Sequence, residues 1–380
     1  MKRYIYADHA ATTKLDKDAY EAMVPYLLEE YGNISQPYSF SRSAKAAIKQ
    51  ARETIADCIH ALPEEIYFTS GGTESDNWAI KGSALVDADK CAIITSSIEH
   101  HAVLHSCSAL ERMGYPISYL RVTEDGIITP QELERNIPDK IRLVSIMLAN
   151  NEIGSIQPIA QLSAIAHAHN AIFHTDAVQA VGHIKVDVRE LGIDMLSASA
   201  HKFNGPKGIG FLYMKKGTKM IPYMDGGAQE SGLRAGTVNA AAVIGMAVAL
   251  RKNCDTIDIR NQQLQKLEQI LLDILSTSGI EYMRNGGENH LPGNISLSFR
   301  NIDGEMLLHR LDLMGICVST GAACTSGHTQ ISHVLQAIGL SPEYSKGTIR
   351  ISYGADNTEE DSATIAHAIK RIICNSSTTI

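Results

Sequence analysis

Short apolar runs rich in β-branched residues recur through the first two thirds of the chain, and each ends in a polar turn. They occupy residues 65–69, 91–95, 142–147, 171–175 and 193–197. Stretches with apolar residues near helical spacing lie between them, for example residues 74–86 and 158–169. Strands that alternate with helices in this way predict an α/β domain with a mainly parallel sheet.

The polar turns after these runs contain the side chains most suited to chemistry. They include the segments 70–73, 96–100, 150–152, 176–179 and 199–202. Because ligands of parallel sheets bind beyond the carboxyl ends of the strands, we expect these turns to meet at one site.

The pattern changes after about residue 255. Residues 261–276 have the spacing of an amphipathic helix, and shorter strands are predicted at 294–299 and 348–352. This combination of a helix and short strands is typical of a smaller α+β domain. The apolar run 240–250 is too short to span a bilayer and predicts a buried helix.

Composition narrows the class of protein. The chain has 380 residues, 44% of them hydrophobic, which excludes a disordered chain. The net charge of −8 gives no electrostatic reason to expect nucleic acid or an anionic membrane as a partner. The charged N-terminal residues have no apolar segment typical of a signal peptide, so we expect a cytoplasmic protein.

The seven cysteines are scattered, with no CxxC spacing, which argues against a zinc ribbon or a paired redox motif. Six of them, Cys58, Cys91, Cys107, Cys254, Cys317 and Cys374, are interpreted as structural thiols of a reduced protein. Cys324 alone lies among small, polar residues typical of a loop, where a thiol can be exposed and act as a nucleophile. A harmless loop cysteine is the alternative.

Lys202 and Asp176 together suggest a cofactor. A lysine that follows a strand beside a glycine-rich loop could form a Schiff base with an aldehyde cofactor, although most lysines are surface charges. An aspartate at a strand end could keep a pyridine nitrogen protonated, or could simply cap a helix. The pair indicates pyridoxal phosphate (PLP), and no metal is predicted.

Three further positions fit such a site, each with a simpler alternative. The Ser70-Gly71-Gly72-Thr73 turn could cradle a phosphate, or could be a tight turn with Thr73 as helix cap and Asp76 completing the capping pair. His100 could stack on a ring and exchange protons, or be structural. Arg350 could bind a carboxylate, although most strand arginines lie on the surface.

Taken in order, these segments resemble the cysteine desulfurase family, a class-V aminotransferase-like branch of PLP enzymes. The resemblance covers nearly the whole chain. Its motifs are Tyr6-Ala7-Asp8-His9-Ala10-Ala11-Thr12-Thr13, Ser70-Gly71-Gly72-Thr73-Glu74-Ser75-Asp76-Asn77, Glu99-His100, Asn150-Asn151-Glu152-Ile153-Gly154, His174-Thr175-Asp176-Ala177-Val178-Gln179, Ser199-Ala200-His201-Lys202, Leu233-Arg234-Ala235-Gly236-Thr237 and Gly321-Ala322-Ala323-Cys324-Thr325-Ser326.

The resemblance implies a fold type I PLP-dependent transferase. Its large domain, residues 15–255, would hold a mainly parallel seven-stranded sheet. Residues 1–14 and 256–380 would form the smaller α+β domain with the catalytic cysteine loop.

The resemblance also implies a role for each matched residue. Lys202 would hold PLP, Asp176 would pair with the pyridine nitrogen, and His100 would stack on the ring. The phosphate ligands would be Gly72, Thr73, Ser199, His201 and, from a partner subunit, Thr237. Gln179 and Asn151 would touch the ring hydroxyl region, while Arg350 and Asn33 would hold the substrate carboxylate.

The implied reaction converts L-cysteine to L-alanine. Lys202 would move the Cα proton, and Cys324 would take the sulfur as a persulfide. The Cys324 context is similar to members with a long mobile loop, which pass sulfur to an acceptor protein. The role of Thr237 in a partner's site implies a homodimer with shared active sites. Iron–sulfur cluster assembly, tRNA thiolation and DNA sulfur modification are the candidate acceptor pathways.

The sequence departs from the family pattern at a few positions. Ile34 and Tyr38 stand where proline and histidine are usual, Asn204 replaces a common histidine, and Ala228 and Ser231 replace a frequent glycine and arginine. Alternative functions are a selenocysteine lyase, another class-V PLP enzyme such as an aminotransferase, or a scaffold that has lost its chemistry.

Overall fold

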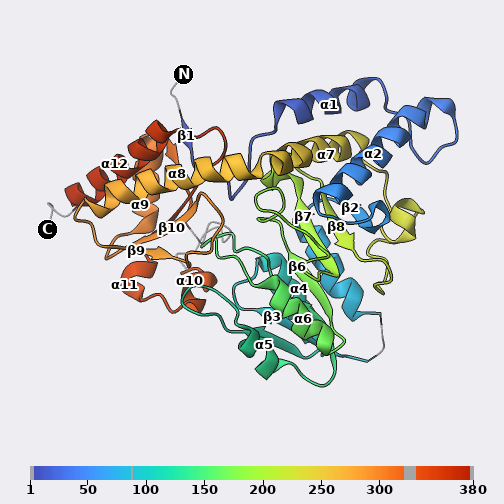
Figure 1. Ribbon diagram of the computed structural model, residues 1–380, viewed down its shortest axis with the longest axis horizontal. Coiled ribbons are helices and arrows are strands. Elements are labelled where there is room, and N and C mark those ends of the chain that lie inside the picture. The colour runs from blue at the N-terminus through green and yellow to red at the C-terminus, as the bar shows by residue number, and fades with distance from the viewer. Residues whose placement is uncertain (1–3, 87–88, 321–330, 377–380) are drawn as a thin grey trace.

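The structure is a computed structural model that describes residues 4–86, 89–320 and 331–376. A central sheet with its helices forms the larger part, and a smaller sheet with its own helices lies beside it (Figure 1). The helices α7 (Ala240–Asp255) and α8 (Ile257–Ser276) follow one another across the molecule from the larger to the smaller part.

The central sheet has seven strands in the order β2-β8-β7-β6-β5-β3-β4. Their bounds are β2 (Ile66–Thr69), β3 (Ala92–Ser96), β4 (Ile117–Leu120), β5 (Ile141–Ser145), β6 (Ile172–Asp176), β7 (Met195–Ser199) and β8 (Gly210–Met214). Only β8 runs antiparallel to its neighbours, so the carboxyl ends of β2, β3, β5, β6 and β7 share one edge. The predicted mainly parallel seven-stranded sheet is confirmed.

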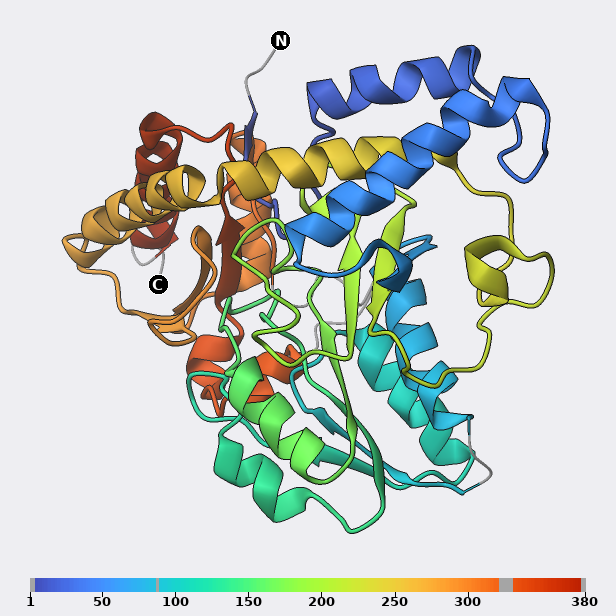
Figure 2. The ribbon, with the colours of Figure 1, turned by 45° about the vertical axis from the view of Figure 1, so that its right-hand side comes forward.

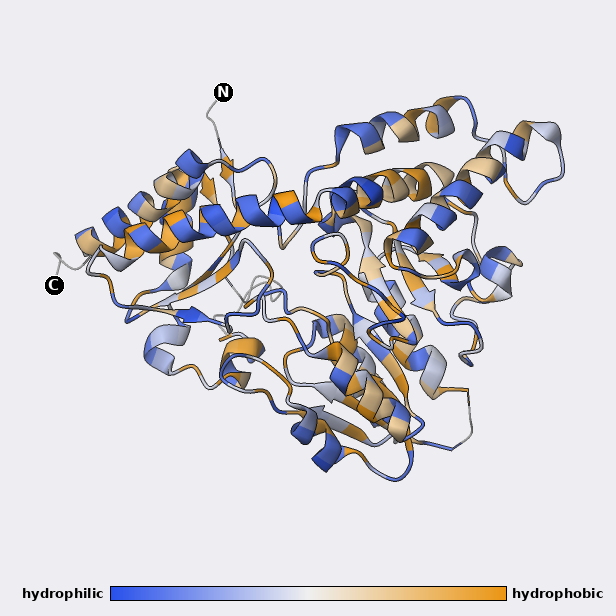
Figure 3. Ribbon diagram, in the orientation of Figure 1, coloured by the Kyte–Doolittle hydropathy of each residue, from blue (hydrophilic) through white to orange (hydrophobic). Residues whose placement is uncertain are grey.

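Helices pack on both faces of this sheet (Figure 2). They are α1 (Lys17–Leu28), α2 (Arg42–Cys58), α3 (Gly72–Asn77), α4 (His101–Arg112), α5 (Pro130–Asn136), α6 (Ile159–Ala168) and α7. In α2 the buried residues Ala44, Ile48, Ala51 and Ile55 recur at helical spacing, which turns one face inward. The apolar helix α7 is buried along most of its length, as predicted, and packs against α1 and α2 (Figure 3).

The predicted helix at residues 74–86 begins earlier and changes its winding. It starts at Gly72 and continues beyond Asn77 as a π-helical turn, Trp78–Gly82. The Trp78 indole is fully buried and donates a hydrogen bond to the Ile221 carbonyl. The wider helical turn coincides with this large side chain. Gly82 leaves room for the indole, because a Cβ on residue 82 would lie 2.8 Å from it.

The smaller part contains an antiparallel sheet of β9 (Tyr282–Asn285), β10 (Asn294–Phe299) and β12 (Thr348–Ser352). The helices α8, α9 (Gly304–Leu313) and α12 (Glu359–Ser376) accompany it, and β1 (Ile5–Tyr6) pairs with β11 (Ile316–Cys317). Leu264, Leu267 and Leu271 of α8 share one core with Ile365 and Ile369 of α12. Because β1 joins this part, the N-terminal residues lie with the C-terminal ones. The domain boundaries at 14/15 and 255/256 stay a prediction.

The two parts meet at the carboxyl edge of the central sheet. Val334, Leu335 and Ile338, in and just after α10 (His333–Ala337), pack against Ile98 and Met147, which follow β3 and β5. The short helix α11 (Pro342–Ser345) comes next and leads into β12. Among the described residues, no helix combines the length and the apolar character that a membrane span requires.

Candidate active site

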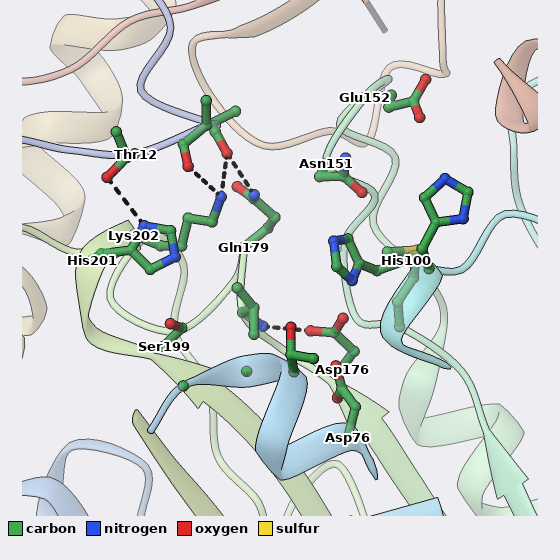
Figure 4. Close-up of a pocket in the computed structure, with 18 of the residues that line it drawn as sticks. Thr12, Asp76, His100, Asn151, Glu152, Asp176, Gln179, Ser199, His201 and Lys202 are labelled. Carbon is green, nitrogen blue, oxygen red and sulfur yellow. Dashed lines mark hydrogen bonds between the residues drawn. The ribbon is translucent and has the colours of Figure 1, made fainter. Parts of the chain in front are cut away.

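A cavity of about 910 Å³ opens at this edge, between the two parts (Figure 4). Its walls bring together ten of the predicted site residues: Gly72, Thr73, His100, Asn151, Asp176, Gln179, Ser199, His201, Lys202 and Arg350. Nine of them come from the ends of central strands or from the turns and first helical residues that follow these strands, and Arg350 comes from β12. The expected meeting of the polar turns is therefore what the structure shows.

Lys202 lies in the 3₁₀ turn η4 (Ala200–Lys202), which follows β7 directly. Its Nζ donates hydrogen bonds to the carbonyl oxygens of Ala10, at 2.6 Å, and Ala11, at 2.8 Å. Gln179 donates to the same Ala10 carbonyl at 3.0 Å. The N-terminal segment thus fixes the lysine inside the cavity, and Figure 4 shows these contacts converging.

Asp176 ends β6 and is 5% exposed. Burial raises the pKa of its carboxyl above the ordinary value, while His100, the Val178 N–H group and Lys202 act in the opposite direction. The Val178 N–H group donates to Asp176 Oδ1 at 2.9 Å. A buried carboxylate of this kind needs a cation beside it to remain charged, which a protonated pyridine nitrogen would provide.

His100 precedes α4 and acts as its N-cap, because its Nδ1 accepts the Ala102 N–H group at 3.1 Å. The proton of the neutral ring therefore lies on Nε2. Burial lowers the pKa of His100 below its ordinary value, and Lys202 lowers it further. A neutral ring is suited to stack on a flat cofactor and to exchange a proton through Nε2.

The end of the cavity near α3 suits an anion. Gly71 has φ of 150°, and a Cβ on Gly72 would lie 2.5 Å from the Val178 side chain, so both positions favour glycine. Thr73 lies inside the helix rather than capping it, since the N-cap is Gly71, and the capping alternative is wrong. The N–H groups of a first helical turn have no acceptor within the helix and are available to a phosphate.

Ser199 and His201 complete this end. His201 Nδ1 lies 3.1 Å from Thr12 Oγ1. Burial and the charges of Lys202 and Lys207 lower the pKa of His201 to about 4, so the ring is neutral at pH 7. Lys207, in the glycine-rich loop after Lys202, also lines the cavity and adds a positive charge to it. The sequence pattern alone did not assign a role to this lysine.

Arg350 is prepared for a carboxylate. Its Nη1 donates to the Asn151 carbonyl at 2.9 Å and its Nη2 to Asp8 Oδ1 at 2.8 Å. The side chain is buried, and its Nε has no hydrogen-bond partner among the described residues. An arginine that lines the cavity and is held in place on two sides fits an α-carboxylate that binds there.

Two predicted residues lie elsewhere and a third cannot be placed. Asn33 is exposed, and its Oδ1 accepts the Ser35 N–H group. Thr237 is also exposed, and neither residue lines the cavity of its own chain. Cys324 lies outside the described residues.

Sequence reasoning also missed some of the cavity's polar side chains. Thr12, Glu152 and Lys207 line it without having been assigned a role, and Asp76 lines it although the sequence suggested only a part in a helix cap. Burial raises the pKa of Glu152 to about 7, against the opposing effects of Ser332 and Arg350. Each of the four stands inside or next to one of the recognised motifs, but sequence position alone did not show that its side chain turns inward.

Comparison with known proteins identifies the family. The chain matches the family Aminotransferase class-V over residues 5–364. A curated relative, the cysteine desulfurase IscS of Dictyoglomus turgidum, is 48% identical over 98% of this chain and 95% of its own. The chain belongs to the cysteine desulfurases of the class-V aminotransferase family.

Solved structures agree with this assignment. A NifS-like protein superposes with a TM-score of 0.92 at 36% identity, over 98% of this chain and 100% of its own. The structure of SspA in complex with cysteine gives a TM-score of 0.81 at 36% identity, over 92% of this chain and 98% of its own. The predicted fold type I architecture, cysteine desulfurase class and PLP cofactor are thereby confirmed.

The cavity of this cysteine desulfurase has the features that PLP requires. The buried Asp176 carboxyl would be stabilised by the cation of a protonated pyridine ring. The Gly71-Gly72 turn leaves space for a phosphate where a Cβ on Gly72 would clash. Lys202 lines the same cavity and is held by the N-terminal segment. These residues therefore fit an aldehyde cofactor with a pyridine ring and a phosphate.

Proposed function

We propose that this cysteine desulfurase takes sulfur from L-cysteine with Lys202 as the proton carrier and Cys324 as the sulfur acceptor. When bound, PLP supplies an electron-withdrawing pyridine ring that makes the Cα proton of the amino acid removable. The observation that supports the proposal is that one cavity contains Lys202, Arg350 and the buried Asp176.

Four residues of the chain have separate roles in the proposed reaction. Arg350 holds the substrate carboxylate through its guanidinium group, and Asp176 holds the pyridine nitrogen in its protonated form. Lys202 takes the Cα proton and later returns a proton to the product. The Cys324 thiolate attacks the substrate sulfur, so that the new S–S bond forms as the C–S bond breaks. The electron pair of the C–S bond stays with Cβ, which takes up the proton given up by the substrate thiol, and alanine and a Cys324 persulfide result.

The test is a product assay of the PLP-loaded protein. With L-cysteine and a reducing thiol, alanine and sulfide should form in equal amounts. L-Selenocysteine and a keto-acid acceptor, run in parallel, distinguish a selenocysteine lyase and an aminotransferase. Turnover of either of these at a higher kcat/KM than L-cysteine would contradict the proposal.

Arg350→Lys should raise KM for L-cysteine about 10- to 100-fold with a smaller change in kcat. Lysine keeps the charge but loses the planar set of donors, and a hydrogen bond to a charged group is worth about 1.5–3 kcal/mol. Steady-state kinetics measure the effect. The matched control is Arg300→Lys, at an exposed ion pair with Glu281, and an unchanged KM in Arg350→Lys would contradict the assignment.

We also propose that the active protein is a homodimer. The segment from the end of α1 to the beginning of α2 exposes large apolar side chains, with Leu28 70% and Tyr31 72% exposed. Asn33 lies in this segment, and Thr237 is likewise exposed away from its own cavity. A second copy that covered these apolar side chains would let both residues serve the partner's cavity.

Sedimentation equilibrium should therefore give twice the chain mass of 41.3 kDa. Tyr31→Asp, which places a charge in the apolar segment, should shift the equilibrium toward the monomer, while Tyr4→Asp serves as an exposed control outside it. A monomeric wild-type protein with full activity would contradict the shared site.

The sulfur on Cys324 passes, in this proposal, to an acceptor protein of iron–sulfur cluster assembly or tRNA thiolation. The six described cysteines are all free thiols, as suits a reducing compartment, and we infer a cytoplasmic location. Transfer of labelled sulfur from the protein to candidate acceptors measures this step. An acceptor that receives sulfur equally well from Cys324→Ser would contradict it.

A further inference from the structure

A second buried carboxyl group lies close to Asp176, the carboxylate proposed to pair with the pyridine nitrogen of the cofactor. Asp76, on α3, is 1% exposed, and Figure 4 shows its side chain directed toward Asp176. One oxygen of each carboxyl and one ring nitrogen of His100 all lie within 4.8 Å of one another. Two carboxyl groups this close in a buried site cannot both be ionised without a compensating cation.

In the part of the chain that the structure describes, the groups around Asp76 provide no such cation. His174 Nε2 lies 3.8 Å from Asp76 Oδ1, but burial lowers the pKa of His174 to about 3, so the ring is neutral. The ring nitrogens of His174 lie 2.8 Å from Ser145 Oγ and 3.0 Å from Ser197 Oγ, and Ser197 also hydrogen-bonds to Asp76. None of the described residues forms a hydrogen bond with Asp76 Oδ1.

The remaining neighbours make a second negative charge still less favourable. Asp176 ends β6 beside Asp76. Burial raises the pKa of the nearby Glu99 to about 8, so this carboxyl is itself mostly protonated at pH 7. His100, the N-cap of α4, is neutral. Burial, Asp176 and Glu99 all raise the pKa of Asp76 well above its ordinary value.

The other elements packed on α3 do not change this balance. Strand β2 contributes Tyr67, which packs in one core with Trp78, whereas Tyr213 of β8 belongs to the core on the opposite face of the sheet. Strand β7 contributes serines.

Helix α4 contributes Cys107, a thiol whose pKa burial raises to about 12, and its Arg112 is hydrogen-bonded to Ser108. The π-helical turn that follows α3 has Lys81, which donates to Asn77. On α3 itself, Glu74 is paired with Arg234. Among the described residues, no lysine or arginine forms an ion pair with Asp76.

We propose that Asp76 is a positioning residue that keeps a proton in the folded protein and presents it to Asp176 as a hydrogen-bond donor. Asp176 then bears the negative charge that faces the pyridine nitrogen. Its carboxylate is held by the Val178 N–H group on one side and by the Asp76 hydroxyl on the other. The inference rests on the proposed role of Asp176 and deepens it. Asp76 does not contact the reacting atoms.

The variants Asp76→Asn and Asp76→Ala test whether Asp76 acts as a hydrogen-bond donor or as a negative charge. Asparagine retains an N–H donor but cannot titrate, whereas alanine has no donor. Dialysis of the loaded proteins against graded PLP should show wild-type affinity within about threefold for Asp76→Asn and about tenfold or more weakening for Asp76→Ala, the size expected for one lost hydrogen bond to a charged group. An ionised Asp76 predicts instead that both variants weaken alike.

The pH dependence of unfolding provides a second readout. A folded-state pKa above the unfolded value near 4 means that the wild-type protein must lose the Asp76 proton on unfolding above that pH. The stability of the wild-type holoenzyme should therefore fall relative to Asp76→Asn as the pH rises above about 4, the unfolded-state value. The exposed Asp139→Asn should show no such trend against the wild type.

The outcomes are decisive in each direction. Equal weakening of PLP binding in both Asp76 variants, or parallel pH profiles of the wild type and Asp76→Asn, overturns the proposal. Asp176→Asn tests the premise separately: if it binds PLP as the wild type does, the role of Asp176 fails. If Asp176→Asn binds weakly while Asp76→Asn shows no difference in pH profile, only the Asp76 proposal fails.

Discussion

Lys202→Ala should lower L-cysteine turnover at least ~10³-fold, because it removes both the amine that holds the cofactor and the group that moves the Cα proton. The neighbouring imidazole of His100 is neutral and lies on another turn, so it does not take over both tasks. Alanine production from L-cysteine measures the loss, and the visible absorption of the bound cofactor should change at the same time.

A surface lysine provides the control for this variant. Lys185 forms an exposed ion pair with Asp258, and Lys185→Ala should retain wild-type turnover. Turnover of Lys202→Ala within tenfold of the wild type would show that another base carries the proton. Exogenous methylamine, added to Lys202→Ala, should restore part of the activity if proton transfer is the missing step.

Cys324→Ser should abolish persulfide formation and lower alanine production at least ~10²-fold, because a hydroxyl is a far weaker nucleophile than a thiolate. Intact-protein mass spectrometry after a single turnover should find the mass of one added sulfur atom on the wild type and none on the variant. PLP absorption should stay unchanged, which separates this effect from loss of the cofactor.

The matched control is Cys374→Ser, since Cys374 on α12 is an exposed thiol. This variant should form the persulfide as the wild type does. A persulfide on the Cys324→Ser protein, or wild-type release of sulfide by it, would mean that a different thiol accepts the sulfur. The position of Cys324 rests on the sequence motif alone, since it lies outside the described residues.

The strand ends of the central sheet were predictable because their signals are local. Strands β3, β6 and β7 differ from the runs in the sequence by one or two residues at each end, and the polar turns after them contain His100, Asp176 and Lys202. Parallel strands place such turns at one edge, so the main residues of the cavity followed from the pattern. The π-helical turn at Trp78 did not, because it coincides with packing against residues more than a hundred positions away.

The sequence by itself determined the strand–turn–helix units, the family and the identity of the chemical groups, because turn residues and side-chain periodicity act over a few positions. Only the tertiary structure decided which of these groups meet. It placed Asp76 beneath Asp176 rather than at a helix cap, turned Arg350 of the smaller part into the cavity, and left Asn33 and Thr237 exposed. Such proximities depend on strand order and on how helices and parts pack, which link residues far apart in the chain and are not encoded in any short segment.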